Sequence, residues 1–153
     1  MTSLLKKLNY KAQNSVHLIN HPREFEQEID AIKHLVSLEF EMKEMQTIDF
    51  ILIFAKTKEE INHYFSILQN KLKDDGVLWF AYPKGTSKKY KVEISRDHGW
   101  EILGKNEFKP VRAVAIDNDW SALRFRKAAY IKTLTRNEKN SLSDEGKYET
   151  QTT

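Results

Sequence analysis

Residues 50–82 read FILIFAKTKEEINHYFSILQNKLKDDGVLWFAY, and this stretch decides the fold class. Phe50–Ala55 is continuously apolar and rich in β-branched and aromatic residues, as is typical of a strand buried on both faces. Thr57–Glu60 is a capping box that predicts the start of a helix. The polar sequence Asp74–Gly76 is expected to end that helix, and Val77–Tyr82 predicts a second buried strand. One helical face carries the apolar residues Ile61, Tyr64, Phe65, Leu68 and Leu72. The stretch therefore predicts a strand–helix–strand unit with parallel strands.

Three elements are predicted before this unit. Val16–Ile19 is a short apolar run that predicts a strand, and a helix is expected over Pro22–Ala31 because apolar residues recur there at helical spacing. Leu35–Phe40 predicts a weaker strand. The gap between it and Phe50–Ala55 is shorter than the dozen or so residues that a parallel crossover needs. These two strands are therefore either an antiparallel pair or not neighbours in the sheet.

The C-terminal part predicts a hairpin. A helix is expected somewhere within Tyr90–Asn106, although two glycines weaken it. Val111–Ile116 and Ser121–Arg126 predict two strands, joined by a turn at Asp117–Asp119. We therefore predict a three-layer α/β fold with a Rossmann-like, mostly parallel sheet and a C-terminal antiparallel hairpin. One domain is expected over residues 1–131, followed by a polar, disordered tail over residues 132–153.

The composition excludes several classes of protein. The chain of 153 residues has no cysteine, which excludes disulfide scaffolds, zinc ribbons and cysteine nucleophiles. No apolar run approaches the roughly 18 residues of a membrane helix, so no membrane partner is predicted and a cytoplasmic protein is expected. The net charge of +3 is unevenly distributed: residues 79–131 contain 11 basic and 6 acidic side chains, a balance of +5. Such a block suggests an anionic partner.

Several short motifs resemble an uncharacterised bacterial family of unknown function. The most distinctive is the Asp119–Phe125 sequence, DWSALRF, and a second is Tyr82-Pro83-Lys84. The resemblance covers roughly residues 16–126 and implies a fold, but it supplies no catalytic residue.

A looser similarity is to the second half of class I methyltransferases. In that family a strand, a helix ending in Leu-Lys-x-x-Gly and a strand of the Gly-x-Leu type recur, as in Leu72–Leu78 here. The family also places a glycine-rich turn after its first strand, so that the backbone can approach the cofactor. Here the corresponding loop, Ile19–Arg23, has no glycine. The resemblance implies a Rossmann-like sheet, and the departure argues against ordinary S-adenosylmethionine binding, so no cofactor is predicted.

The best candidate site is the loop that follows the Val77–Tyr82 strand. It leaves the carboxyl end of a predicted parallel strand, where open α/β sheets bind their ligands. Gly85 allows close approach of a ligand to the backbone, while the hydroxyls and lysines favour an anion such as phosphate. The predicted ligand-binding residues of this loop are Lys84, Gly85, Thr86 and Ser87. The alternative interpretation is a solvated basic loop, because the sequence does not match a P-loop.

His21 and Asp117 complete the predicted rim. Each follows a predicted strand, and a histidine beside a carboxylate can do acid–base work near neutral pH. The simpler interpretation is a histidine before a helix-opening proline and an aspartate that starts a turn. Asp117–Asp119 also has the spacing of a divalent-metal or sugar-nucleotide site, but a hairpin turn explains it better, and no metal site is predicted.

Nucleic-acid binding is the less favoured partner prediction. The three tryptophans, Trp79, Trp100 and Trp120, suggest base stacking, but they are expected to be core residues in a domain of this size. The basic residues that could contact phosphates are Arg112, Arg124, Arg126 and Lys127. We therefore expect a non-enzymatic or regulatory domain that binds a small anionic, phosphate-bearing ligand. The alternatives are a diverged methyltransferase-like enzyme and a nucleic-acid or protein interaction module, and a homodimer through an edge strand stays open.

Overall fold

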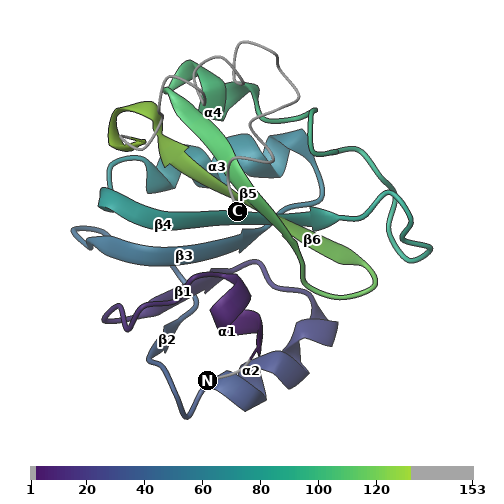
Figure 1. Ribbon diagram of the computed structural model, residues 1–153, viewed down its shortest axis with the longest axis horizontal. Helices are drawn as coiled ribbons and strands as arrows, with labels where there is room; N and C mark the ends of the chain where they lie inside the picture. The colour runs from purple at the N-terminus through teal and green to yellow at the C-terminus, as the bar shows by residue number, and fades with distance from the viewer. Residues whose placement is uncertain (1–2, 132–153) are drawn as a thin grey trace.

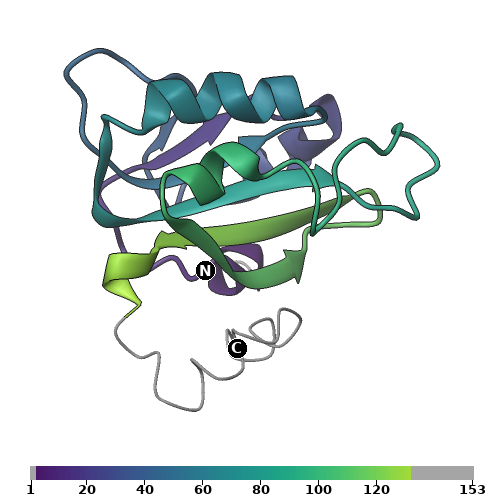
Figure 2. The same cartoon turned by 90° about the horizontal axis from the view of Figure 1, so that it is seen from above.

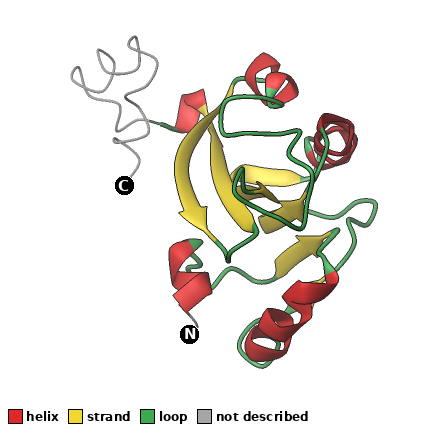
Figure 3. Ribbon diagram, turned by 90° about the vertical axis from the view of Figure 1, so that its right-hand side faces the viewer, coloured by secondary structure: helices red, strands yellow, loops and turns green. Residues whose placement is uncertain are grey.

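The computed structural model describes residues 3–131, which form a six-stranded sheet with helices on both faces (Figures 1 and 3). The strand order is β2-β1-β3-β4-β6-β5. The strands are β1 (Val16–Ile19), β2 (Leu38–Glu39), β3 (Ile48–Phe54), β4 (Leu72–Pro83), β5 (Phe108–Ala115) and β6 (Trp120–Lys127). The α-helices are α1 (Ser3–Lys7), α2 (Glu26–Ile32), α3 (Lys58–Leu68) and α4 (Glu101–Lys105).

The sheet confirms the predicted fold class. Strands β2, β1, β3 and β4 are parallel, β6 is antiparallel to β4, and β5 is antiparallel to β6. The parallel part is Rossmann-like, and the antiparallel strands β6 and β5 extend the sheet beyond β4. The predicted tail over residues 132–153 lies outside the described residues.

The strand–helix–strand unit forms as the sequence predicts. The Thr57 side chain accepts a hydrogen bond from the Glu60 amide at 3.1 Å, and the Glu60 carboxylate accepts one from the Lys56 amide at 2.6 Å. These two hydrogen bonds satisfy backbone amides at the start of α3 and stabilise it. Ile61, Phe65 and Leu68 of α3 are fully buried against the sheet. Figure 2 shows α3 lying along β4.

The end of this helix was predicted wrongly. Helix α3 ends at Leu68, and Asp74–Gly76 lies inside β4, where the pairing with β3 is irregular between Ile48 and Phe50. An extra Cβ at Gly76 would lie 2.8 Å from the Leu72 side chain, so the strand is crowded at this irregularity. The glycine therefore serves close packing within a strand rather than a helix end.

Two uncertain elements differ in extent from their predictions. The Leu35–Phe40 segment contributes the two-residue strand β2, which pairs in parallel with β1 and is not a neighbour of β3. Strand β1 lies between the two, which resolves the open alternative. Within Tyr90–Asn106 only the five-residue helix α4 forms, and the rest is irregular apart from a bridge between Ser95 and His98. No helix in residues 3–131 has the length and hydrophobicity to span a membrane.

Candidate functional site at the carboxyl edge of the sheet

The four parallel strands end at one edge of the sheet, which we call the carboxyl edge. Asn20, Phe40, Ala55 and Lys84 follow β1, β2, β3 and β4 at this edge. The 84–100 segment extends from the same edge (Figures 1 and 2). Open α/β sheets bind ligands beyond the carboxyl ends of their strands, so this edge is the natural place to look for a site.

The turn after β1 takes a left-handed conformation without glycine. Asn20 has φ +62°, a conformation that asparagine adopts more readily than most residues. Its side-chain amide donates to the Phe54 carbonyl at 2.9 Å and to Glu60 at 3.3 Å, which ties β1 to the end of β3 and to the start of α3. An asparagine thus supplies the backbone turn for which the sequence offered no glycine.

His21 lies beside an exposed aromatic ring. Its Nε2 atom is 2.8 Å from a carboxylate oxygen of Glu26, and its ring centroid is 5.6 Å from that of Phe40. Phe40 is 49% exposed, which is unusual for a large apolar side chain, while the His21 side chain is 19% exposed. Phe40 also borders a shallow hollow of about 550 Å³ beside β2. Sequence reasoning assigned Phe40 only to a strand, because exposure at a strand end leaves no periodic signal.

Glu24 is the centre of a hydrogen-bond network at the same edge. One oxygen accepts hydrogen bonds from the Tyr90 hydroxyl and from Trp120 Nε1, the latter at 3.1 Å, and Lys89 Nζ lies 3.3 Å from the other. Burial raises the pKa of the Glu24 carboxyl, but the hydrogen bonds from Tyr90, Trp120, the backbone and Lys89 outweigh it and lower the pKa to about 2.

The same network affects the tyrosine. Burial, the hydrogen bond to Glu24 and the charge of Glu24 raise the pKa of Tyr90 to about 12. The Tyr90 ring also lies 5.0 Å from that of Trp120, and Lys56 lies over it at 5.6 Å. The network therefore holds the 84–90 loop against the 3-10 turn Arg23–Phe25, which precedes α2. No local sequence pattern predicts the long-range contact between Glu24 and Trp120.

The predicted loop residues lie at the carboxyl edge, but the Ser87 hydroxyl and the Lys84 amide already form hydrogen bonds within the protein. The Ser87 hydroxyl donates to Asp119 at 2.9 Å and accepts from the Lys89 and Tyr90 amides at 3.1 and 3.2 Å. The Lys84 amide donates to the Asp119 carbonyl at 2.8 Å. Thr86 and Gly85 are exposed, and a Cβ added at Gly85 would meet nothing within 4 Å, so this glycine is not required by crowding.

The structure does not bring His21 and Asp117 together. His21 pairs with Glu26, whereas Asp117 Oδ1 accepts from the amides of Asp119 and Trp120 at 2.8 and 2.9 Å. Strands β3 and β4 separate the β1 end, where His21 lies, from the β6 turn. The Asp117 side chain therefore stabilises the hairpin turn, which was the simpler of the two interpretations.

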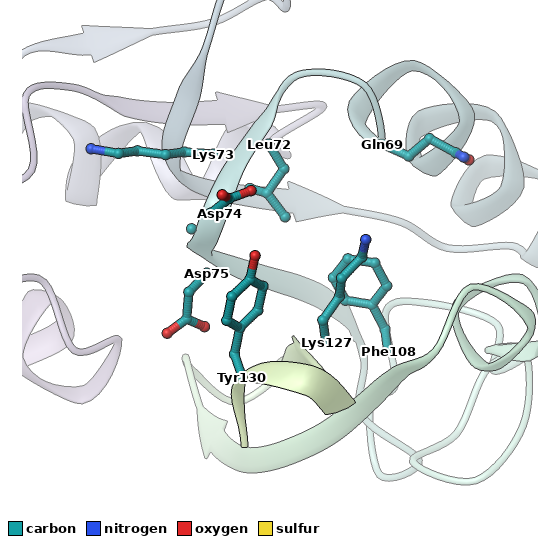
Figure 4. Close-up of a pocket in the computed structure, with 9 residues that line it drawn as sticks. Gln69, Leu72, Lys73, Asp74, Asp75, Phe108, Lys127 and Tyr130 are labelled. Carbon is teal, nitrogen blue, oxygen red and sulfur yellow. The ribbon is translucent and has the colours of Figure 1, made fainter. Parts of the chain in front are cut away.

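A second hollow lies at the opposite edge of the sheet, around the irregular start of β4 (Figure 4). Its volume of about 50 Å³ is far below the several hundred Å³ of a typical ligand pocket. Lys73, Asp74 and Tyr130 surround it together with Lys127, whose ammonium lies 5.9 Å from the Phe108 ring centroid. Its size and position make it a weaker candidate than the carboxyl edge.

Comparisons with known proteins identify the fold. No protein-family model and no curated protein sequence matches the chain, so the resemblance to the uncharacterised bacterial family lacks that support. Among solved structures, the N-methyltransferase NodS from Bradyrhizobium japonicum WM9 matches with a TM-score of 0.53 and 14% identity, over 81% of this chain and 91% of that chain. The same enzyme in complex with S-adenosyl-L-homocysteine matches with a TM-score of 0.53 and 13% identity, over 82% and 83%. This chain has a Rossmann-like fold similar to that of NodS.

These matches correct one expectation. We expected a non-enzymatic or regulatory binding domain from the position and lysine content of the loop after β4, but the structures that match with TM-scores above 0.5 are those of an enzyme. At these identities the likeness shows the fold alone, and the non-enzymatic expectation is withdrawn.

Proposed function

We propose that the chain is a diverged methyltransferase-like enzyme that binds a nucleoside-bearing methyl donor at the carboxyl edge, between the ends of β1 and β2. The observation that carries the proposal is the fold that it shares with NodS, including the complex with S-adenosyl-L-homocysteine. S-adenosylmethionine, when bound, would supply an electrophilic methyl group.

The residues at this edge fit such a donor. The half-exposed Phe40 ring offers a stacking surface for a purine, and His21 and Glu26 add polar atoms beside it. The left-handed turn at Asn20 replaces the glycine-rich turn of the family. Because the Asn20 side chain crosses from β1 to β3, we propose that the donor lies toward β2, over the hollow next to Phe40.

The basic loop remains a proposed contact for anionic groups. Lys84 and Thr86 extend from the end of β4, across β3 from the β1 turn. We propose that they contact an anionic group of the donor or of the methyl acceptor. Gly85 and Ser87 then shape the loop rather than touch the ligand, since Ser87 is bonded to Asp119.

Calorimetric titration tests the proposal. S-adenosylmethionine and S-adenosyl-L-homocysteine are titrated into the full chain and into Phe40→Ala and Met45→Ala variants. Met45 is fully exposed in the loop that follows β2, so its variant removes an equally exposed apolar side chain near the site. We expect Phe40→Ala to weaken binding about tenfold, as loss of one aromatic stacking partner does, and Met45→Ala to leave it unchanged. Absence of binding by the unaltered chain at millimolar ligand would overturn the proposal.

A further inference from the structure

The β5–β6 hairpin gathers cations on one face. Arg124 and Arg126 follow each other at a two-residue interval on β6, and the antiparallel register places Arg112 opposite Arg124 and Lys109 opposite Arg126. Residues opposite each other on neighbouring strands share a face, so all four side chains emerge from the same side of the hairpin. We call this set, Lys109, Arg112, Arg124 and Arg126, the basic face.

The face is continuous with α1. Lys7 Nζ donates to the Ala115 carbonyl at 3.3 Å, which places a fifth cation at the end of β5. Figure 3 shows the N-terminal helix beside the end of this hairpin. Lys127 is not part of the face, because it lies over Phe108 on the other side of the sheet.

Few carboxylates neutralise these cations. Asp75 binds Arg126 through two hydrogen bonds of 2.9 and 2.7 Å. Within residues 3–131, Lys109, Arg112 and Arg124 have no carboxylate partner within 4 Å. Burial lowers the pKa of Arg124, and the charges of Arg126 and Arg112 lower it further, with Asp75 opposing them.

This arrangement is costly for the folded chain alone. Like charges directly opposite each other on paired strands are destabilising, and here two such pairs are adjacent. In addition, Arg124 Nε is buried without a hydrogen-bond partner among the described residues. A ligand that brings several negative charges to the face would relieve the repulsion between the opposed cations.

We propose that the basic face binds the phosphate backbone of a nucleic acid. Arginine forks match phosphate oxygens, and three of the four residues are arginines. An acidic protein partner is the alternative, but protein interfaces usually need apolar anchors. The large exposed hydrophobic side chains of the described chain lie elsewhere, at Leu35, Phe40, Met45 and Val92. Trp79 and Trp120 are buried in the core, so the binding is to the backbone and not to the bases.

The proposal does not depend on the methyl donor, and fluorescence anisotropy of a labelled 20-base-pair duplex with the full chain tests it separately. Neutralisation of about four phosphates predicts that log K falls with log salt concentration with a slope of about −4. The double variant Arg112→Gln, Lys109→Gln is expected to weaken binding at least tenfold and to reduce the slope by about 2. Both positions lie on the edge strand β5, so the folded chain tolerates these changes, and a thermal melt of each variant checks this.

Two control variants locate the surface, and the second of them removes the same number of cations as the test variant. Lys127→Gln removes a cation from the opposite face of β6, and Lys88→Gln, Lys91→Gln removes two exposed cations from the loop at the carboxyl edge. Both are expected to change affinity less than twofold. Loss of binding in the loop variant, salt-insensitive binding, or no binding at 50 mM salt would overturn the proposal. Equal competition by polyglutamate would overturn it in favour of an acidic protein partner.

Discussion

Neutralisation of Glu24 should destabilise the folded chain in a pH-dependent way. The carboxylate accepts hydrogen bonds from the Tyr90 hydroxyl and Trp120 Nε1, and Lys89 lies within ion-pair distance. A Glu24→Gln variant keeps the size and one acceptor oxygen, but it removes the charge and places an amide donor near these groups. The variant therefore tests whether the charge, and not the shape, holds the 84–90 loop at the carboxyl edge.

The size of the effect follows from the pKa. Lowering the pKa of Glu24 from 4.5 to about 2 corresponds to at most about 3 kcal/mol of stability. We expect about 2 kcal/mol, because 24% of the side chain is exposed and water screens the interactions. A group whose pKa is lowered on folding stabilises the chain above its unfolded pKa. That contribution is complete above about pH 5 and falls as the pH drops from 4.5 toward 2.

Urea denaturation of the unaltered chain and of Glu24→Gln, at pH 7 and at pH 3, measures this directly. We expect a difference in the free energy of unfolding of about 2 kcal/mol at pH 7 and roughly half of that or less at pH 3. Glu93→Gln, which neutralises an exposed carboxylate of the same segment, should differ by less than about 0.5 kcal/mol at both pH values. A Glu24→Gln difference that is equal at the two pH values would refute the assignment of the stabilisation to the charge.

Two further predictions concern packing and charge. Gly76→Ala should destabilise the chain by about 1–3 kcal/mol, because the new methyl group would lie 2.8 Å from the Leu72 side chain. Gly104→Ala in α4 has open space around it and should stabilise the chain by about 0.5–1 kcal/mol. Thermal melts of both variants measure the two effects. Arg112→Leu should stabilise the chain by about 0.2–1 kcal/mol at low salt, because it removes the like charge opposite Arg124, and the gain should shrink at 1 M salt in urea denaturation.

The sequence predicts the elements whose signals are local. The capping box at Thr57 and the apolar repeat of α3 lie within one turn or one helix face, so the strand–helix–strand unit could be predicted in order and type. Strand β2 could not be predicted in extent or pairing. Its two residues are too few for a periodic pattern, and its place beside β1 depends on pairing with residues more than 20 positions earlier in the sequence, such as Val16 with Leu38. Within Tyr90–Asn106 the helix is limited to α4, and the start of the segment is held by contacts with distant residues, such as the hydrogen bond from Tyr90 to Glu24.

The candidate site was predictable only as a region. Strand ends define the carboxyl edge, so His21 and Lys84 were placed at the right edge from the sequence. The exposure of Phe40 depends on tertiary packing, which no local pattern predicts. The same holds for the contact between Glu24 and Trp120, which are 96 residues apart in the sequence. We took the missing glycine after β1 as an argument against ordinary S-adenosylmethionine binding, and the structure shows that Asn20 adopts a left-handed conformation there without a glycine.

The basic face shows the same limit more sharply, because a single irregularity places Arg112 on it. Strict alternation along β5 would place Lys109 and Arg112 on opposite faces, since they are three residues apart. The register shifts between Pro110 and Arg112, so that Lys109 lies opposite Arg126 while Arg112 lies opposite Arg124. A β-bulge re-aims the side chains that follow it, and here it adds Arg112 to Lys109, Arg124 and Arg126, which raises the number of cations on this face from three to four. The charge excess of residues 79–131 is visible in the sequence, but the position of Arg112 on the same face as Lys109 is a property of this bulge.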